Sequence, residues 1–287
     1  MKNFAINYNS SKDINEGIIE IIKISLFNNF PDCNIFLYKD SIGLKDEFTK
    51  SMDILIVLGG DGTILRAAGA ISGYNIPILG INTGNLGYLS SIELKDLEYA
   101  VAKIKNGEFD IENRLMLECK LQGEDEKLYS LNDVVVSKGV IPGVAAYKIY
   151  IDDKFYTDIE GDGVIISTPT GSTAYNISAG GPIIYPNLQV IAVTPICSHY
   201  VGIRPMVIDG SSRIKIKIKE RNEKVYLVVD GNSIKEVEYK REILIEKSEY
   251  TCKLIKFENY NYYNILKNKI LGTRNIEGEV YENRKTQ

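Results

Sequence analysis

The sequence predicts an N-terminal Rossmann-like α/β domain followed by an all-β, C-terminal β-sandwich-like domain. Strand-like and helix-like segments alternate through the first third of the 287 residues, which is typical of a parallel sheet covered by helices. After about residue 110, apolar and polar residues alternate with a period of two, which favours antiparallel strands. A chain of this length is also long enough for two domains. We therefore expect domains at residues 1–108 and 109–259, with residues 260–287 packing back on the first.

The first domain is expected to begin with a strand at residues 4–7 and a helix capped by Ser10 or Ser11. Apolar residues recur at helical spacing along that helix, at Ile14, Ile18, Ile21, Ile22 and Leu26. A later helix, ended by Gly107, has one apolar face made of Leu94, Leu97, Val101 and Ile104. Between them, apolar runs predict strands at 34–38, 53–58 and 76–82 and a helix at 63–70.

The second domain is expected to contain short strands at residues 147–151, 213–219, 224–230 and 242–247. Turn signals occur between them, at Asp152-Asp153, Asp209-Gly210 and Asp230-Gly231. The lysines of residues 213–219 alternate with isoleucines, so we interpret them as the solvent-facing side of a strand rather than a basic binding patch. Residues 260–271 show a further helical pattern.

Composition argues against several classes of function. The formal net charge of −4 leaves no basic excess for broad nucleic-acid binding, although a nucleotide site needs only a few local donors. No apolar run approaches about 18 residues and the N-terminus has no signal-peptide core, so we expect no membrane partner and a cytoplasmic location. The four cysteines are far apart and there is one histidine, which argues against a zinc site or a disulfide framework. Acid–base chemistry must therefore depend mainly on carboxylates.

The first candidate for chemistry is the turn Gly59-Gly-Asp-Gly-Thr63, between an apolar strand and a helix-like segment. Its glycines let a ligand approach the backbone, and the free N–H groups at the helix start favour phosphate. Asp61 puts a carboxylate in this anion-binding turn. A carboxylate repels phosphate, but it could accept a proton from a sugar hydroxyl beside one. Taken alone, the turn fits a tight strand-to-helix corner equally well.

The second candidate is the run from Gly161 to Pro182, where a short apolar strand leads into a dense series of small hydroxyl residues and glycines. Asp162 stands between two glycines. Thr170, Ser172 and Thr173 could cap a short helix and leave hydroxyls facing a ligand. Because both halves occur within 22 residues, a purely structural turn is a poor explanation.

Together these motifs resemble the NAD kinases, which use ATP to phosphorylate the 2′-hydroxyl of NAD. The family's marks recur in order as Gly59–Thr63, Asn82-Thr-Gly-Asn-Leu-Gly87, Asn132-Asp133, Thr168–Pro182 and Thr194-Pro-Ile-Cys-Ser-His199. The glycine turn alone is shared with diacylglycerol kinases, sphingosine kinases and phosphofructokinases, whereas the Thr168–Pro182 segment is highly specific. The resemblance implies a site between the two domains, a magnesium cofactor, ATP and NAD as substrates, and a homodimer or homotetramer.

The resemblance also implies roles for individual residues. Asp61 matches the residue that accepts the proton of the adenosine ribose 2′-hydroxyl as that oxygen attacks the γ-phosphorus, and it could also help to hold magnesium. Gly62 and Arg66 are expected beside the nucleotide, and Asn132 and Asp133 match a pair that contacts the dinucleotide. Further residues match the dinucleotide-binding set: Asp162, Thr170, Thr173, Ala174, Tyr175, Asn176, Ile177, Ser178 and Asn232.

The chain departs from the family pattern at a few positions. Many members carry a basic residue where Glu160 stands, and that position is linked in the family to the choice of NAD over NADH. Some members also have a basic residue at Gly143. The family's Asp-Gly-Gln is Asp230-Gly-Asn232 here, with a shorter amide. We interpret His199 as structural, without a catalytic role.

Two other functions stay open as alternatives. A diacylglycerol-type lipid kinase shares the glycine turn, but it would need an apolar channel and membrane affinity. The polar run from Thr168 to Ser178 and the absence of an amphipathic basic helix disfavour it. A non-catalytic NAD(P)-binding sensor would not need Asp61. Assays with diacylglycerol and with NAD would separate the first alternative from an NAD kinase.

Overall fold

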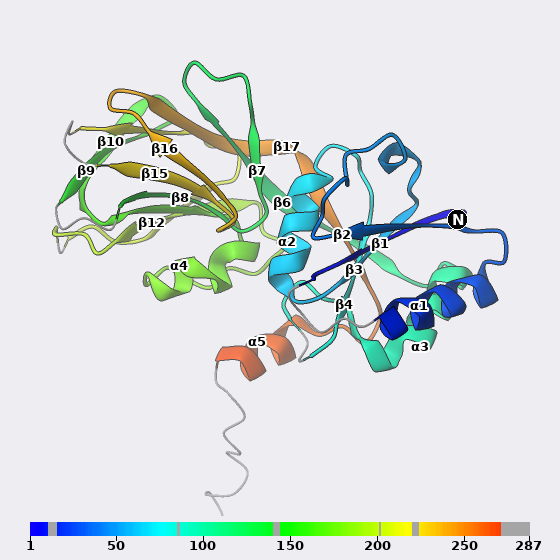
Figure 1. The fold of residues 1–287 in the computed structure, drawn as a ribbon. Helices are drawn as coiled ribbons and strands as arrows, with labels where there is room; N and C mark the ends of the chain where they lie inside the picture. The colour runs from blue at the N-terminus through cyan, green and yellow to red at the C-terminus, as the bar shows by residue number, and fades with distance from the viewer. Residues whose placement is uncertain (11–15, 85–86, 140–143, 201, 220–223, 271–287) are drawn as a thin grey trace, which may run out of the picture.

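The computed structural model describes residues 1–10, 16–84, 87–139, 144–200, 202–219 and 224–270. Figure 1 shows two lobes, joined by the long strand β17 (Glu242–Lys256). The other strands of the larger sheet are β1 (Asn3–Tyr8), β2 (Asn34–Lys39), β3 (Ile54–Leu58), β4 (Ile78–Asn82), β5 (Ile92–Glu93), β6 (Asp110–Leu121), β7 (Leu128–Ser130), β9 (Ala145–Ile151), β10 (Lys154–Gly161) and β14 (Ile214–Ile218). The smaller sheet contains β8 (Asp133–Lys138), β11 (Gly163–Ser167), β12 (Val190–Ile196), β13 (Met206–Asp209), β15 (Val225–Val229) and β16 (Ser233–Val237).

The N-terminal lobe is a parallel sheet between helical layers. β1 pairs in parallel with β2 and β3, and β3 pairs in parallel with β4. Side chains alternate across β3. Ile54, Ile56 and Leu58 pack with α1 (Glu16–Asn29) and α3 (Leu97–Asn106), whereas Leu55 and Val57 pack with α2 (Asp61–Ala70). This arrangement confirms the predicted Rossmann-like fold.

The predicted first helix is present as α1, but its buried face includes Ile19, which was not expected there, and excludes Ile21. Ile21 is 53% exposed, so its assignment to the core face is wrong. The buried stripe contains Ile19, Ile22 and Leu26, which are three and four residues apart and therefore lie on one side of the helix. Ile14 and the proposed cap at Ser11 lie outside the described residues.

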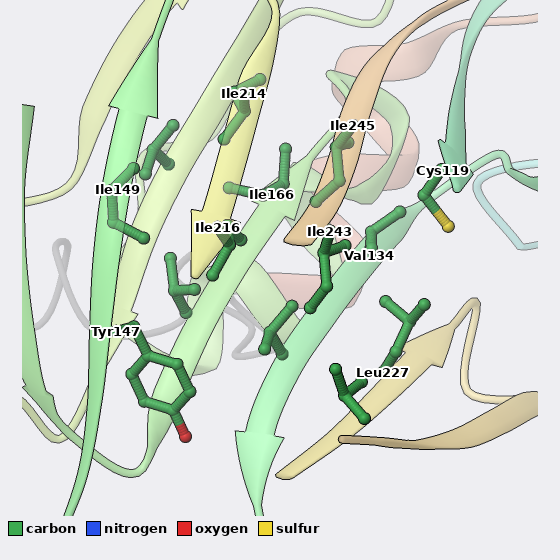
Figure 2. Close-up of a cluster of buried hydrophobic side chains, with 14 of the residues drawn as sticks. Cys119, Val134, Tyr147, Ile149, Ile166, Ile214, Ile216, Leu227, Ile243 and Ile245 are labelled. Carbon is green, nitrogen blue, oxygen red and sulfur yellow. The ribbon is translucent and has the colours of Figure 1, made fainter. Parts of the chain in front are cut away.

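In the C-terminal lobe, the smaller sheet packs face to face on part of the larger one. Figure 2 shows the core between them, where side chains of β9, β14 and β17 meet those of β8, β11 and β15. Along β14 the isoleucines are buried, while Lys215 and Lys217 form ion pairs with acidic side chains on the other face. The predicted β-sandwich-like architecture and the solvent-facing lysines are both confirmed.

The strand predicted at residues 242–247 is too short, because β17 continues to Lys256. It pairs with β14 near its start, with β6 along much of its length, and through Leu254 with Ile78 of β4. One sheet therefore runs through both lobes (Figure 1). Polar side chains at residues 246–249 interrupt the apolar pattern, which is why sequence alone ends the strand early. The proposed domain boundaries stay a prediction.

The helix α5 (Tyr262–Ile270) follows β17 and lies beside the junction of the lobes. The ring of Tyr262 contacts the rings of Tyr88 and Tyr185, with centroids 6.2 and 5.5 Å apart. None of the described helices is long and apolar enough to cross a membrane. Cys33, Cys119, Cys197 and Cys252 are free thiols, and all but Cys197 are buried.

Candidate functional site

The Gly59–Thr63 turn joins β3 to the first turn of α2, as predicted. Gly59 has a φ of +148°, and a Cβ there would lie 2.5 Å from the hydroxyl oxygen of Thr63, so this corner requires glycine. Gly62 differs, because a Cβ at that position would meet no described atom within 4 Å. The N–H groups of Thr63 and Ile64 already donate to the Gly60 carbonyl. The space over Gly62 and the N–H groups of Asp61 and Gly62 at the start of α2 together form a surface that can accept an anion.

Asp61 is the first residue of α2 and is half-buried. Its carboxylate accepts hydrogen bonds from the backbone N–H groups of Tyr88 (2.9 Å) and Leu89 (3.1 Å), in the loop after β4. Gly87 permits this approach, since a Cβ there would lie 2.0 Å from Oδ1 of Asp61. The two glycine motifs therefore meet at one carboxylate. Two accepted hydrogen bonds leave lone pairs for a further donor.

The predicted pair Asn132-Asp133 lies on a turn that Asp230 holds. The Asp230 carboxylate accepts hydrogen bonds from the backbone N–H groups of residues 131, 132 and 133, at 2.8 to 3.1 Å, and from the Ser130 hydroxyl at 2.6 Å. Asp230 itself has a φ of +48°, a conformation that Asp tolerates better than most residues. The Asp-Gly turn at 230–231 therefore fixes the distant loop that carries the pair.

Asp133 and Asp230 interact in a site shielded from water. Burial, and secondarily the charge of Asp230, raises the pKa of Asp133 to about 7. Burial also raises the pKa of Asp230, against the effect of the hydrogen bonds it accepts. Asp133 can therefore donate a hydrogen bond below neutral pH and only accept above it.

The hydroxyl-rich segment beginning at Thr168 packs against the same turn. The Thr168 backbone N–H donates to the carbonyl of Asn132 at 2.8 Å. A Cβ at Gly171 would lie 2.2 Å from that carbonyl oxygen, so the close approach requires glycine. Thr170 is buried, and its hydroxyl accepts a hydrogen bond from Arg114 at 3.3 Å. The Thr170 hydroxyl is thus directed into the protein rather than left facing a ligand.

A cavity of about 300 Å³ opens over this turn. Its mixture of apolar walls and a few polar groups suits a nucleoside. Four of the residues predicted from sequence meet there, together with the turn at 230–231. The lining consists of Asn132, Asp133, Val135, Ser137, Ala174, Tyr175, Val228, Asp230 and Gly231.

Asp162 contributes charge near this cavity. Its carboxylate pairs with Nζ of Lys138 at 3.0 Å, and this hydrogen bond holds the pKa of Asp162 below its usual range. Burial raises the pKa of Tyr175, and the charges of Cys197, Asp162 and Asp133 raise it further. Tyr175 therefore lies among the acidic groups predicted for the dinucleotide pocket.

Several predicted residues lie elsewhere. Asn176 is fully buried: its amide donates to the Pro182 carbonyl at 3.0 Å and accepts from the Thr194 hydroxyl at 2.6 Å, so it acts inside the protein. Arg66 is half-buried on α2, where its charge lowers the pKa of Asp40 only as a minor cause. The remaining predicted residues do not line the cavity: Thr173, Ile177, Ser178 and Asn232.

Glu160 and Asn232, two of the positions that depart from the family pattern, do not line the cavity. Glu160 is half-buried at the end of β10, and its carbonyl accepts the backbone N–H of His199 at 2.8 Å. His199 is exposed. The Asn232 side chain donates to the Asp230 carbonyl at 2.8 Å. Gly143 lies outside the described residues.

Sequence reasoning missed two buried basic residues, Arg114 and Lys256, of which Lys256 lies close enough to Asp61 to interact with its charge. Arg114 is buried and pairs with Glu112 at 2.7 Å. Lys256 is also buried. Burial, followed by the charge of Arg114, lowers the pKa of Lys256 to about 7, while the charges of Glu112 and Asp61 oppose this shift. The available signal was a basic residue directly beside an apolar run, as at Leu254-Ile255-Lys256.

The described residues contain no group of three or more His, Cys, Asp or Glu arranged to hold a metal ion. Mg²⁺ seldom needs such a group, because it is usually bound by one or two carboxylates together with substrate phosphates and water. The Asp61 carboxylate, at a helix start that can accept phosphate, fits that donor set.

A larger cavity, about 540 Å³, lies between β5 and α5. Its lining includes none of the residues predicted from the motifs and no glycine turn. We assign the site instead to the Asp61 turn and the smaller cavity, because backbone donors, carboxylates and motif residues converge there.

Family models for the ATP-NAD kinase N-terminal and C-terminal domains match residues 32–109 and 131–257. An NAD kinase of Clostridium botulinum is 46% identical over 282 residues, covering 97% of this chain and all of the relative. NAD kinases of Clostridium tetani and Clostridium beijerinckii are 45% and 40% identical and cover 94% and 97% of this chain and 99% of each relative.

Two solved structures are similar over nearly the whole chain. Yeast NADH kinase in complex with NADH has a TM-score of 0.83 at 25% identity, covering 100% of this chain and 90% of that one. An NAD kinase from Archaeoglobus fulgidus in complex with ATP has a TM-score of 0.75 at 26% identity, covering 94% and 99%. These comparisons confirm the predicted fold and the predicted enzyme class, a phosphotransferase of the ATP-NAD kinase type. The chain belongs to the NAD kinase family.

Proposed function

We propose that this chain transfers the γ-phosphate of ATP to the 2′-hydroxyl of the adenosine ribose of NAD, with Asp61 as the proton acceptor. One observation carries the assignment to Asp61. This carboxylate stands at the start of α2, is held by two backbone N–H groups of the 87–89 loop, and keeps lone pairs for a third donor. A sugar hydroxyl would be such a donor.

In the proposed reaction the 2′-oxygen attacks the γ-phosphorus and the bond to the β–γ bridging oxygen breaks, which releases ADP. The hydroxyl proton passes to Asp61. The N–H groups of Asp61 and Gly62 at the start of α2 face the transferred phosphate, and the lack of a Cβ at Gly62 leaves room for it. Catalysis of this kind consists mainly of positioning and charge stabilisation, because little covalent chemistry falls to the protein.

The adenosine part of NAD is assigned to the cavity at Asn132, Asp133 and Tyr175. The Tyr175 ring can present a flat face to the adenine, while Asp133 offers a carboxyl to a ribose hydroxyl or to a ring amine. Relatives support both substrates, since one similar structure is described with ATP and another with NADH.

Magnesium is proposed as the cofactor, held by Asp61 together with the phosphates of ATP. When bound, it would neutralise charge on the transferring phosphate. The chain's own contribution is to orient Asp61 and to supply backbone N–H donors. Homodimer or homotetramer formation and a cytoplasmic location are proposed from the family resemblance and the free cysteines. Light scattering of the purified chain would measure the assembly.

The choice between NAD and NADH is proposed to depend on Glu160, where many family members have a basic residue. Glu160→Arg is expected to raise the ratio of kcat/KM for NAD to that for NADH. Glu160→Gln provides the matched control, because it removes the charge without adding a positive one. Unchanged ratios in both variants would exclude Glu160 as a determinant.

The central test is an assay of NADP formation by the full chain, with ATP or polyphosphate as donor and NAD or NADH as acceptor. Diacylglycerol serves as the competing acceptor. Phosphorylation of NAD by ATP is expected. Phosphorylation of diacylglycerol alone, or binding of NAD without turnover, would overturn the proposal in favour of a lipid kinase or a sensor.

A further inference from the structure

One peptide group links Asp61 to the C-terminal part of the chain. The N–H of Leu89 donates to Asp61 Oδ1 at 3.1 Å, and the carbonyl of the same peptide group, that of Tyr88, accepts the hydroxyl of Tyr260 at 3.2 Å. Hydrogen bonds on the two ends of one peptide polarise each other, because the group is a single dipole. Tyr260 therefore acts on Asp61 through one intervening peptide.

Lys256 holds the next part of the same loop. Its Nζ donates to the carbonyls of Leu89 at 3.1 Å and Ser90 at 3.2 Å, and it lies 3.9 Å from the ring centroid of Tyr260. The Lys256 side chain is buried, at 5% exposure. Ser91 adds a further contact, because its hydroxyl donates to the carbonyl of Ile255. The loop 88–91 is therefore held in place by the end of β17, through Ile255 and Lys256, and by Tyr260 in the turn that follows.

A second buried cation, Arg114, lies between this network and the hydroxyl-rich segment. Arg114 lies close enough to Tyr260 for its charge to act on the Tyr260 hydroxyl, and it donates a hydrogen bond to the hydroxyl of Thr170 in the hydroxyl-rich segment at 3.3 Å. Burial raises the pKa of Tyr260 to about 12, so its hydroxyl keeps its proton at neutral pH and can donate to the Tyr88 carbonyl. Arg114 therefore lies between Thr170 and Tyr260, and Tyr260 reaches Asp61 through one intervening peptide.

Packing alone does not explain these residue types. A buried lysine and a buried arginine lose much of their favourable hydration, a cost that an apolar side chain of similar size would avoid. The Lys256 ammonium donates to the loop that holds Asp61, whereas Arg114 pairs with Glu112 and donates to Thr170 in the hydroxyl-rich segment. Polar groups arranged in this way fix orientation more than they increase stability.

We propose that Tyr260, supported by Lys256, is a positioning residue that orients Asp61 through the Tyr88–Leu89 peptide. This proposal rests on the proposed role of Asp61 and goes beyond it, because it assigns a part in the reaction to residues at the far end of the chain. Both residues are assigned to the loop carbonyls of residues 88–90 and not to the reacting atoms.

The first test is Tyr260→Phe, which removes one hydroxyl and keeps the ring beside Lys256. We expect kcat to fall about three- to tenfold, as for the loss of one neutral hydrogen bond, while KM for NAD and for ATP stays within about twofold. Tyr263→Phe is the matched control, since Tyr263 lies three residues on, is 65% exposed and stacks on Tyr185. An unchanged kcat in Tyr260→Phe, or an equal fall in the control, would overturn the proposal.

The second test compares Lys256→Arg with Lys256→Met. Arginine keeps a cation that can reach backbone carbonyls, so we expect it to retain more of kcat than methionine does, with NAD binding by calorimetry similar in both. If Lys256→Met does not fold, the Tyr260→Phe result still decides. Asp61→Asn distinguishes a failure of the proposed function from a failure of this inference. Normal turnover by Asp61→Asn would contradict the proposed function. An inactive Asp61→Asn together with a normal Tyr260→Phe would contradict only the positioning role of Tyr260.

Discussion

Asp61 and Asp230 each hold a loop that is distant in the sequence, but their carboxylates differ in how many hydrogen bonds they accept. Asp230 accepts four hydrogen bonds, from Ser130 and from three backbone N–H groups. Asp61 accepts two, from Tyr88 and Leu89. A carboxylate offers about four lone-pair sites. The Asp230 carboxylate is therefore saturated and structural, whereas the Asp61 carboxylate keeps capacity for a substrate.

The surroundings of Asp61 are open to a ligand, whereas those of Asp230 are closed. Asp61 stands at the start of α2 beside open space over Gly62, where an anion is favoured. Asp230 lies in a tight turn beside Asp133, and burial raises the pKa of both groups. Counting accepted hydrogen bonds thus separates a carboxylate available for chemistry from one that shapes the pocket, even though both belong to Asp-Gly motifs.

The largest expected effect would come from Asp61→Asn. The amide cannot accept the ribose proton, so we expect kcat to fall by about a hundredfold or more, while NAD affinity changes little. Steady-state NADP formation together with calorimetric NAD binding would measure the two effects. Near-normal turnover would contradict the proposal that the remaining lone pairs of the Asp61 carboxylate accept the ribose proton.

Asp230→Asn should instead disturb the fold of the pocket. The amide nitrogen would face backbone N–H groups that need an acceptor, so we expect a loss of about 2 kcal/mol of unfolding free energy and a raised KM for NAD. Urea unfolding would measure the first effect. Asp209→Asn is a suitable control, because Asp209 holds only an exposed turn at Ser211 and should cost much less. Equal losses of unfolding free energy in the two variants would contradict the structural role assigned to Asp230.

Asp133 should make stability depend on pH near neutrality. Its folded pKa of about 7 lies above the ordinary value of 3.8, so its contribution is complete below about pH 4 and is lost as pH rises through 7. Relative to Asp133→Asn, the wild type should lose on the order of 2 kcal/mol between pH 5 and pH 8. Parallel unfolding curves at the two pH values would test this, and a constant difference would contradict the assigned pKa.

The smallest effect is expected at Asn232. Its amide reaches the Asp230 carbonyl but is exposed and outside the cavity. Asn232→Gln, which restores the amide common in the family, should change stability by less than about 0.5 kcal/mol and kcat/KM by less than about twofold. A large change would mean that the turn at Asp230 needs the Asn232 amide in addition to the hydrogen bonds that the Asp230 carboxylate accepts.

The parts of the molecule that sequence predicts are those governed by local sterics. The turn at Gly59 and the alternation along β14 depend on neighbours within a few positions, so their patterns are visible in the chain. The grouping of Asn132, Asp133, Ala174 and Tyr175 followed from the family resemblance.

Contacts between distant segments could not be read in the same way. Lys256 meets Leu89 across 167 positions, and Asp230 meets Asn132 across 98. No periodicity encodes such pairs. Asn176 shows that a residue within a binding motif can also be misassigned. Its amide donates to the Pro182 carbonyl and accepts from the Thr194 hydroxyl, inside the protein. Membership of a motif identifies a segment but not the direction of each side chain.

The long strand β17 has a mechanical consequence. Since it is hydrogen-bonded in both lobes, the lobes cannot swing apart about a flexible linker, as they do in many enzymes that close on their substrates. Bending would be concentrated where the ladder with β6 is interrupted, between Lys247 and Thr251. Substrate entry should therefore depend on loops and side chains at the rim, and the lobes should unfold as one cooperative unit.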